Sequence, residues 1–402
     1  MPGYIEKRGE DSYRLVVSSG YGTGGKRKKY TKTIKVNGKT EPERKKKCEK
    51  ELAKFIAKIE SNSFIEPSKL TLKEFTEKWL KDYAEKNLAP KTIFRYKQML
   101  DSRIFPALGH IKITKLKPIN FIEFYNNLTE DGIREDGKSG GLSPQTIRHH
   151  HRLLHTILEH AVKWQMLSSN PTDNVDPPKV KKVEASFYDE DEVKKLIAAL
   201  ELIDKKNFKY KVAILLTLSS GLRLGELAGL KWDNVNFEKQ TISIVQSNQY
   251  LPKIGTFTKD PKNNTSIRTL YIPENVINLL SKYKSEQKKI ELACGDKWID
   301  SGFIFTQWNG KPMYPGTPSK WFSKFLRKNN LKPITFHQLR HTSASLLINE
   351  NINIREISKR LGHSNTSTTL NIYSHALKSA DKDAADKLNT IIFSNDSINN
   401  KD

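Results

Sequence analysis

The alternation of hydrophobic and polar residues predicts a short strand-forming region at the start of the chain. Residues 13–17 and 30–36 alternate apolar and polar side chains, as strands with one buried face do. A glycine-rich segment at residues 20–25 separates them and predicts a turn. Residues 42–60 instead repeat apolar side chains at helical spacing. Residues 1–65 are therefore expected to form a small sheet with one helix.

Amphipathic helices are predicted throughout residues 70–176. Thr71 is followed three residues later by a glutamate, which is the capping-box pattern of a helix start. Further helices are expected where apolar residues recur at helical spacing, over residues 90–100, 118–128 and 144–166. This region is expected to be an all-helical domain.

A proline-containing basic segment, residues 170–182, separates that domain from the rest of the chain. Each proline disfavours helix at the residue before it, so an extended linker is expected. Residues 186–393 are mainly helical in pattern, with a strand-rich insert at residues 241–273. The predicted fold class is thus α+β and multidomain. It comprises an N-terminal sheet-plus-helix domain, an all-helical domain, and a mainly helical domain with a small antiparallel sheet insert.

The charge balance narrows the choice of partner. The chain of 402 residues carries 69 Lys and Arg against 45 Asp and Glu, a net charge of +24. Such an excess repels itself in a compact protein and is typical of proteins that bind polyanions, above all nucleic acid. No apolar run approaches the roughly 20 residues of a spanning helix, and no signal-peptide core is present. With only two cysteines, a cytoplasmic protein without disulfides is expected.

Residues 335–375 contain the side chains best suited to chemistry on a phosphodiester: His337, Arg340, His363 and Tyr373. Histidine transfers protons near neutral pH, and the planar guanidinium of arginine matches a phosphate. The tyrosine hydroxyl can form a covalent ester. A second stretch ends an apolar helix at Gly221 and continues with Arg223 and Glu226. Glu226 is close enough in sequence to orient Arg223 by a charge-assisted hydrogen bond, although alone this would be an ordinary surface pair.

Taken together, these motifs resemble the tyrosine recombinases, the family of phage-type integrases. The resemblance rests on the order and spacing of Gly-Leu-Arg-Leu-Gly-Glu-Leu at 221–227, His-Gln-Leu-Arg-His-Thr at 337–342, Leu-Gly-His at 361–363 and Tyr-Ser-His at 373–375. It implies that Tyr373 attacks the scissile phosphate and forms a 3′-phosphotyrosyl link.

The resemblance also implies roles for the other motif residues. Arg223 and Arg340 would hold the non-bridging oxygens, and His337 would accept or hold the proton of Tyr373. His363 would donate a hydrogen bond to a phosphate oxygen. No cofactor and no metal would be needed, because two arginines replace the charge of a metal ion.

The general acid that protonates the leaving 5′-oxygen is expected to be a lysine of the strand insert. Aligned without gaps on the family pattern Pro-Lys-Thr-Lys-Ser-Ser-x-Arg, Lys262 takes this position, six residues before Arg268. The chain departs from that pattern at residues 263–265. Lys259 therefore remains the alternative to Lys262.

The layout of the chain is also similar to that of integrases. Residues 1–65 look like an arm-site DNA-binding domain, residues 70–176 like a core-site DNA-binding domain, and residues 186–393 like the catalytic domain. The residues expected to contact DNA are Lys26, Arg27, Lys28, Lys29 and Arg148. An amphipathic helix at residues 376–392 is expected to dock either on a neighbouring protomer or on its own domain.

The function expected from the sequence is site-specific recombination of double-stranded DNA that integrates and excises a phage or conjugative transposon. A homotetramer would join core and arm attachment sites and exchange strands through a Holliday junction. A directionality factor and a host DNA-bending protein are possible partners. The alternatives are a DNA-relaxing enzyme like type IB topoisomerases and a non-catalytic DNA-binding regulator.

Overall fold

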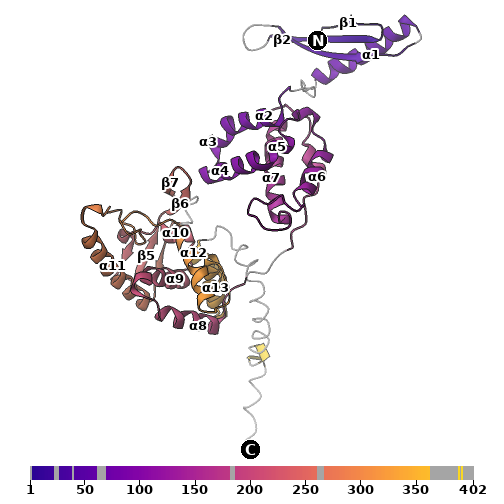
Figure 1. Ribbon diagram of the computed structural model, residues 1–402. Helices are drawn as coiled ribbons and strands as arrows, with labels where there is room; N and C mark the ends of the chain where they lie inside the picture. The colour runs from indigo at the N-terminus through magenta and orange to yellow at the C-terminus, as the bar shows by residue number, and fades with distance from the viewer. Residues whose placement is uncertain are drawn as a thin grey trace, which may run out of the picture. The chain divides into compact units, whose positions relative to one another are not determined.

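The computed structural model describes residues 2–21, 27–38, 40–60, 69–181, 186–259 and 267–362, with short pieces at 388–389 and 391–392 (Figure 1). The chain divides into two compact units, residues 1–182 and 183–402. The fold is the expected mixture of helices with small antiparallel sheets.

A three-stranded antiparallel sheet and one helix form the N-terminal region. The strands lie in the order β1 (Gly3–Lys7), β2 (Ser12–Tyr21) and β3 (Arg27–Lys35), and they are followed by α1 (Glu41–Glu60). Leu15 and Val17 of β2 pack against Phe55 and Ile59 of α1. The sequence prediction missed β1, whose five residues are too short for a clear alternation.

The helical region contains the predicted helices, two of which continue through a π-helical turn into a further helical piece. Thr71 caps α2 as expected, because its backbone N–H donates to Glu74 at 2.8 Å and its hydroxyl accepts from the Glu74 N–H at 3.3 Å. The elements are α2 (Leu72–Trp79), η1 (Leu80–Ala84), α3 (Glu85–Asn87), α4 (Pro90–Met99), η2 (Leu100–Ile104), α5 (Phe105–Leu108), η3 (Ile113–Lys115), α6 (Pro118–Asn127), α7 (Pro144–Lys163) and η4 (Pro171–Asn174). Single π-helical turns, η1 and η2, join the pieces of the two continued helices.

The second unit is mainly helical. Its helices are α8 (Glu190–Glu201), η5 (Lys205–Asn207), α9 (Phe208–Ser220), α10 (Leu224–Ala228), η6 (Trp232–Asn234), α11 (Glu274–Cys294), η8 (Gly295–Lys297), α12 (Thr317–Lys328), α13 (Phe336–Asn349) and α14 (Ile354–Leu361). The strand insert forms one antiparallel sheet of β4 (Val235–Asn236), β5 (Thr241–Ile244) and β8 (Arg268–Tyr271), and a hairpin of β6 (Ser247–Leu251) and β7 (Gly255–Lys259).

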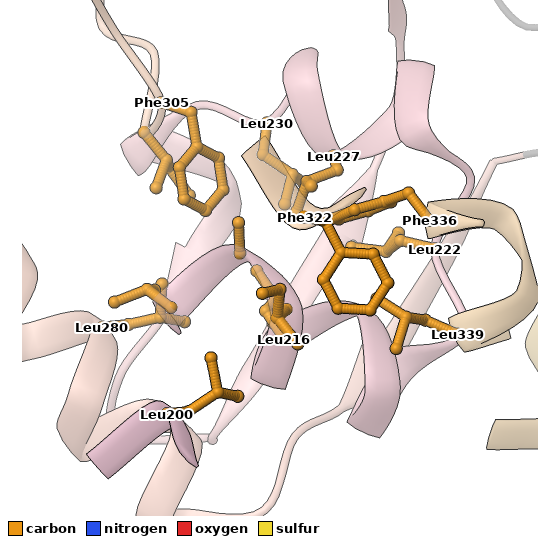
Figure 2. Close-up of a cluster of buried hydrophobic side chains, with 14 of the residues drawn as sticks. Leu200, Leu216, Leu222, Leu227, Leu230, Leu280, Phe305, Phe322, Phe336 and Leu339 are labelled. Atoms are coloured by element: carbon orange, nitrogen blue, oxygen red, sulfur yellow. The ribbon is translucent and has the colours of Figure 1, made fainter. Parts of the chain in front are cut away.

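Helix α9 lies at the centre of this unit and packs against α11, α12 and α13. It is apolar on most of its surface, which is the pattern of a buried helix. Figure 2 shows part of the core around it, to which Leu222, Leu227, Phe336 and Leu339 belong. Each of these four residues is adjacent in sequence to one polar residue of the site: Arg223, Glu226, His337 or Arg340. Burial of the apolar neighbours therefore fixes the backbone from which the polar side chains project.

Candidate active site

The site is built where α9 ends. Gly221 terminates the helix in the left-handed conformation, with φ 68° and ψ 25°. Glycine is favoured in this conformation because it has no Cβ to clash with the backbone. Arg340, from α13, is 2% exposed and donates a hydrogen bond of 2.6 Å to the carbonyl oxygen of Gly221. The end of α9 is thus tied to the helix that carries His337 and Arg340.

Glu226 binds two arginines from different elements. Arg223, at the start of α10, donates from its backbone N–H at 3.0 Å and from its guanidinium at 2.8 Å. Arg268, the first residue of β8, donates to both carboxylate oxygens at 3.3 and 2.8 Å. Burial alone would raise the pKa of Glu226, but the hydrogen bonds and charges of Arg268 and Arg223 outweigh it and lower that pKa. The carboxylate is therefore ionised at neutral pH.

Arginine side chains also cover the carboxyl end of α14. Arg223 donates to the carbonyl oxygens of Gly362 at 2.9 Å and Leu361 at 3.5 Å, and Arg268 donates to that of Arg360 at 2.8 Å. The last carbonyl groups of a helix lack partners within the helix and carry partial negative charge. Cationic side chains are stabilised there. This contact brings the segment that leads to His363 beside Arg223.

The histidines of α13 are held neutral by their surroundings. Partial loss of hydration, followed by the charges of Arg340 and Arg223, lowers the pKa of His337. Part of the residue's surface is still exposed. His341 lies edge-on to His337, with ring centroids 5.0 Å apart. Burial and the nearby His337 and Arg340 lower the pKa of His341 to about 4. An uncharged, accessible His337 is suited to accept a proton.

The structure thus brings Arg223, Glu226, His337 and Arg340 together. Lys259 ends β7 and is partly buried. Lys262, His363 and Tyr373 lie outside the described residues, as does the expected helix at 376–392 apart from the short pieces at its end. The roles of these residues stay predictions.

Arg268 is the residue of this cluster that sequence reasoning missed, since it served there only to set the register of Lys262. Its partners Glu226 and Arg360 lie 42 and 92 residues away. No local pattern in a single sequence shows contacts of that separation. The signal that was present is a charged residue that begins a predicted strand.

The expected DNA contacts lie in the first unit. Lys29 is exposed on β3 and Arg148 is partly buried on α7, whereas Lys26 and the side chains of Arg27 and Lys28 lie outside the described residues. Because Leu15 and Val17 face α1, alternation places Arg14 on the opposite face of the sheet. Lys35 pairs with Ser12 on that same face. Sequence reasoning did not single out these two cations.

The described residues contain no group of side chains arranged to bind a metal ion. In the ranges given above, no three His, Cys, Asp or Glu residues converge as metal ligands would. His155 Nε2 on α7 lies 3.1 Å from Asp173 Oδ1, which makes a pair and not a cluster of ligands. Among the helices that the structure describes, none is long and apolar enough to cross a membrane.

Comparisons with known proteins agree with this arrangement. Residues 186–380 match the model of the phage integrase family, and residues 71–129 match that of the phage integrase N-terminal SAM-like domain. The chain is 28% identical to a XerC-like tyrosine recombinase of Caldanaerobacter subterraneus subsp. tengcongensis, over 96% of this chain and 98% of that one. It is 29% identical to the ICEBs1 integrase of Bacillus subtilis, over 63% and 67%.

A solved structure shares the fold. The Tn1549 transposon integrase in complex with a circular intermediate DNA superposes with a TM-score of 0.64 at 23% identity, covering 79% of this chain and 99% of that one. The two family models fall on both the helical region and the second unit. The chain therefore belongs to the phage integrase family of tyrosine recombinases, which cut and rejoin DNA.

Proposed function

We propose that this chain is the site-specific recombinase of a phage or conjugative transposon, which it integrates and excises through a 3′-phosphotyrosyl intermediate. The observation that carries this proposal is the convergence of Arg223, His337 and Arg340 at the end of α9, with Glu226 bound to Arg223. Family membership and similarity to integrases of mobile elements support it.

In the proposed cleavage step, the hydroxyl oxygen of Tyr373 forms a bond to the scissile phosphorus as the bond to the 5′-oxygen breaks. His337, which its neighbours keep uncharged, accepts the tyrosine proton. The phosphodiester bond is exchanged for a phosphotyrosyl bond, so religation by the same route in reverse needs no ATP. Lys262, or alternatively Lys259, protonates the leaving 5′-oxygen.

Arg223 and Arg340 neutralise charge on the non-bridging oxygens in the transition state, and His363 donates a hydrogen bond there. The Arg223 side chain is 38% exposed, so a phosphate can reach it directly. Arg340 is 2% exposed and donates a hydrogen bond to Gly221. Its guanidinium would therefore act on the phosphate from the buried side of the site. Both charges are permanent, since arginine stays protonated in proteins, and the step therefore runs without a metal ion.

The rest of the chain is proposed to bind and assemble the DNA. Residues 1–65 would bind arm sites, residues 70–176 core sites, and residues 186–393 would carry catalysis. The free face of the N-terminal sheet, with Arg14 and Lys35, supports a contact with double-stranded DNA. We further infer a homotetramer on two DNA partners in the cytoplasm, assisted by a directionality factor and a host DNA-bending protein.

The test is covalent trapping on a library of nicked duplexes, whose nick prevents religation after cleavage. The intact chain should form an adduct with DNA that withstands denaturation, and the trapped duplexes identify the site. Tyr373→Phe, which lacks the hydroxyl, should bind the same duplex without forming the adduct. An adduct that persists in Tyr373→Phe would overturn the assignment of the nucleophile.

A further inference from the structure

Glu226 has all its acceptor positions filled by two arginines. A carboxylate offers about four lone-pair positions. At Glu226, Oε1 accepts from the guanidinium groups of Arg223 and Arg268, and Oε2 accepts from the Arg223 backbone N–H and from Arg268. The residue is 6% exposed, so water does not replace a missing donor easily. Each arginine thus supplies half of the contacts of a buried charge.

Arg268 joins three segments of the second unit. It starts β8, binds Glu226 of α10, and donates from Nε to the carbonyl oxygen of Arg360 at the end of α14. Its side chain is 7% exposed. A Cβ added at Gly362 would lie 2.7 Å from Arg268 Nη1, so the backbone that receives the Arg223 hydrogen bond packs directly on Arg268.

The sum of the charges shows what Arg268 contributes. Arg223 and Glu226 alone would cancel, and the buried carboxylate would attract the guanidinium of Arg223 away from a substrate. With Arg268 present, the three groups carry a net charge of +1. Glu226 can then orient Arg223 while the cluster still presents positive charge to a phosphate. The interaction of Arg268 with Glu226 is stronger than it would be in water, because both side chains are buried.

We propose that Arg268 is a positioning residue for strand cleavage, which acts through Glu226 to keep the guanidinium of Arg223 oriented and available to the scissile phosphate. This inference rests on the proposed function, since it needs Arg223 to act on a phosphate. It differs from the simpler reading of Arg268 as a buried ion pair that only stabilises the fold. On that reading, its loss would lower the fraction of folded enzyme without changing how the enzyme responds to charge on the substrate.

The experiment measures single-turnover adduct formation by the full-length chain at saturating enzyme on nicked duplexes. One duplex has an ordinary scissile phosphate, and the others carry either diastereomer of a methylphosphonate, in which a methyl group replaces one charged oxygen. The readout is the ratio of the two rates within one protein sample, which does not depend on the fraction of active enzyme. The variants are Arg223→Gln, Arg268→Gln and Arg268→Lys.

Lys211→Gln is the matched control. Lys211 is also a largely buried cation of the second unit, with a side chain 12% exposed and an ion pair of 2.5 Å to Glu201, but it lies outside the cluster. Its removal should leave the ratio unchanged. Circular dichroism and thermal unfolding of each variant report folding separately.

Arg268→Gln is expected to slow adduct formation on the phosphate duplex about 10- to 100-fold, the range typical of losing one electrostatic contact to a transition state. The methylphosphonate-to-phosphate ratio should rise about tenfold or more, for the same diastereomer as in Arg223→Gln. Arg268→Lys, which keeps the charge, should recover part of the rate. Adding Glu226→Gln to Arg268→Gln should also recover part of it, because the unbalanced carboxylate is gone.

The inference is overturned if Arg268→Gln slows both substrates equally while Arg223→Gln changes the ratio. That result would leave the proposed function intact and make Arg268 a structural residue. If Arg268→Gln folds poorly, Arg268→Met, which also removes the charge but keeps a long side chain, decides instead, and an unchanged ratio there contradicts the proposal. Failure of the proposed function appears differently, as the absence of a Tyr373-dependent adduct in the unsubstituted chain.

Discussion

The guanidinium of Arg340 donates a 2.6 Å hydrogen bond to the carbonyl oxygen of Gly221, which lies 119 residues earlier in the chain. A helix that ends in the left-handed conformation turns its last carbonyl groups outward, where they need partners. Arg340 supplies one such partner and is itself buried by this contact. The same two residues therefore terminate α9 and place a permanent positive charge at the site.

Gly221→Ala should destabilise the protein strongly. Alanine strains the backbone at φ 68°, and its Cβ would overlap the Leu361 side chain. Left-handed strain and overpacking each cost about 1–3 kcal/mol, so the free energy of unfolding should fall by roughly 2–6 kcal/mol. Gly255→Ala is the control, because Gly255 has φ 85° but nothing within 4 Å of an added Cβ. Urea unfolding measures both, and equal losses would contradict the role assigned to Leu361.

His341 should make stability depend on pH. Its pKa of about 4 in the folded protein lies below the usual value of about 6.5. Between these two values the unfolded chain binds more protons, so the free energy of unfolding decreases as pH falls from about 6.5 towards 4. His341→Gln should remove roughly 2 kcal/mol of this decrease, given about 1.4 kcal/mol per pKa unit and partial exposure. His110→Gln, at an exposed position, controls for the substitution, and identical pH profiles in urea unfolding would refute the prediction.

The choice between Lys262 and Lys259 can be decided chemically. A general acid is needed only while the leaving 5′-oxygen must gain a proton, and a 5′-thiolate leaves without one. Lys262→Ala should slow cleavage of an ordinary duplex about 100-fold or more, within the usual contribution of a general acid. A duplex with a 5′-bridging sulfur should restore its rate. Lys259→Ala is the paired variant, and rescue of that variant instead would move the role to Lys259.

The free face of the N-terminal sheet should govern binding to the arm site. The double substitution Arg14→Gln and Lys35→Gln should reduce the dependence of log affinity on log salt by about two phosphate contacts, a change of roughly 1.8 in slope. Cleavage at the core site should continue. Lys54→Gln is the control, since Lys54 is an exposed cation on α1 that pairs with Glu51. Fluorescence anisotropy at several salt concentrations measures the slopes, and equal slopes for all three proteins would exclude this face.

Relations between neighbouring residues were determined by the sequence alone. The capping box at Thr71, the amphipathic periods of the helices and the strand insert follow from residues a few positions apart, and they appear in the structure. The pairing of Arg223 with Glu226 belongs to this class, because three residues at a helix start bring the two side chains within reach. The motifs also sufficed to indicate the family.

Only the tertiary structure decided which distant groups share the site. It placed Arg268 on Glu226, Arg340 on the end of α9, and Arg223 on the end of α14, across separations of 42, 119 and 139 residues. These contacts depend on how the apolar faces of α9, α13 and the small sheet pack together. Hydrophobic packing sets the distance between elements. The hydrophobic pattern of the sequence does not indicate which polar side chains from different elements will meet. For that reason Arg268 served only to set the register of Lys262 in the sequence, whereas in the fold it shares the carboxylate of Glu226 with Arg223.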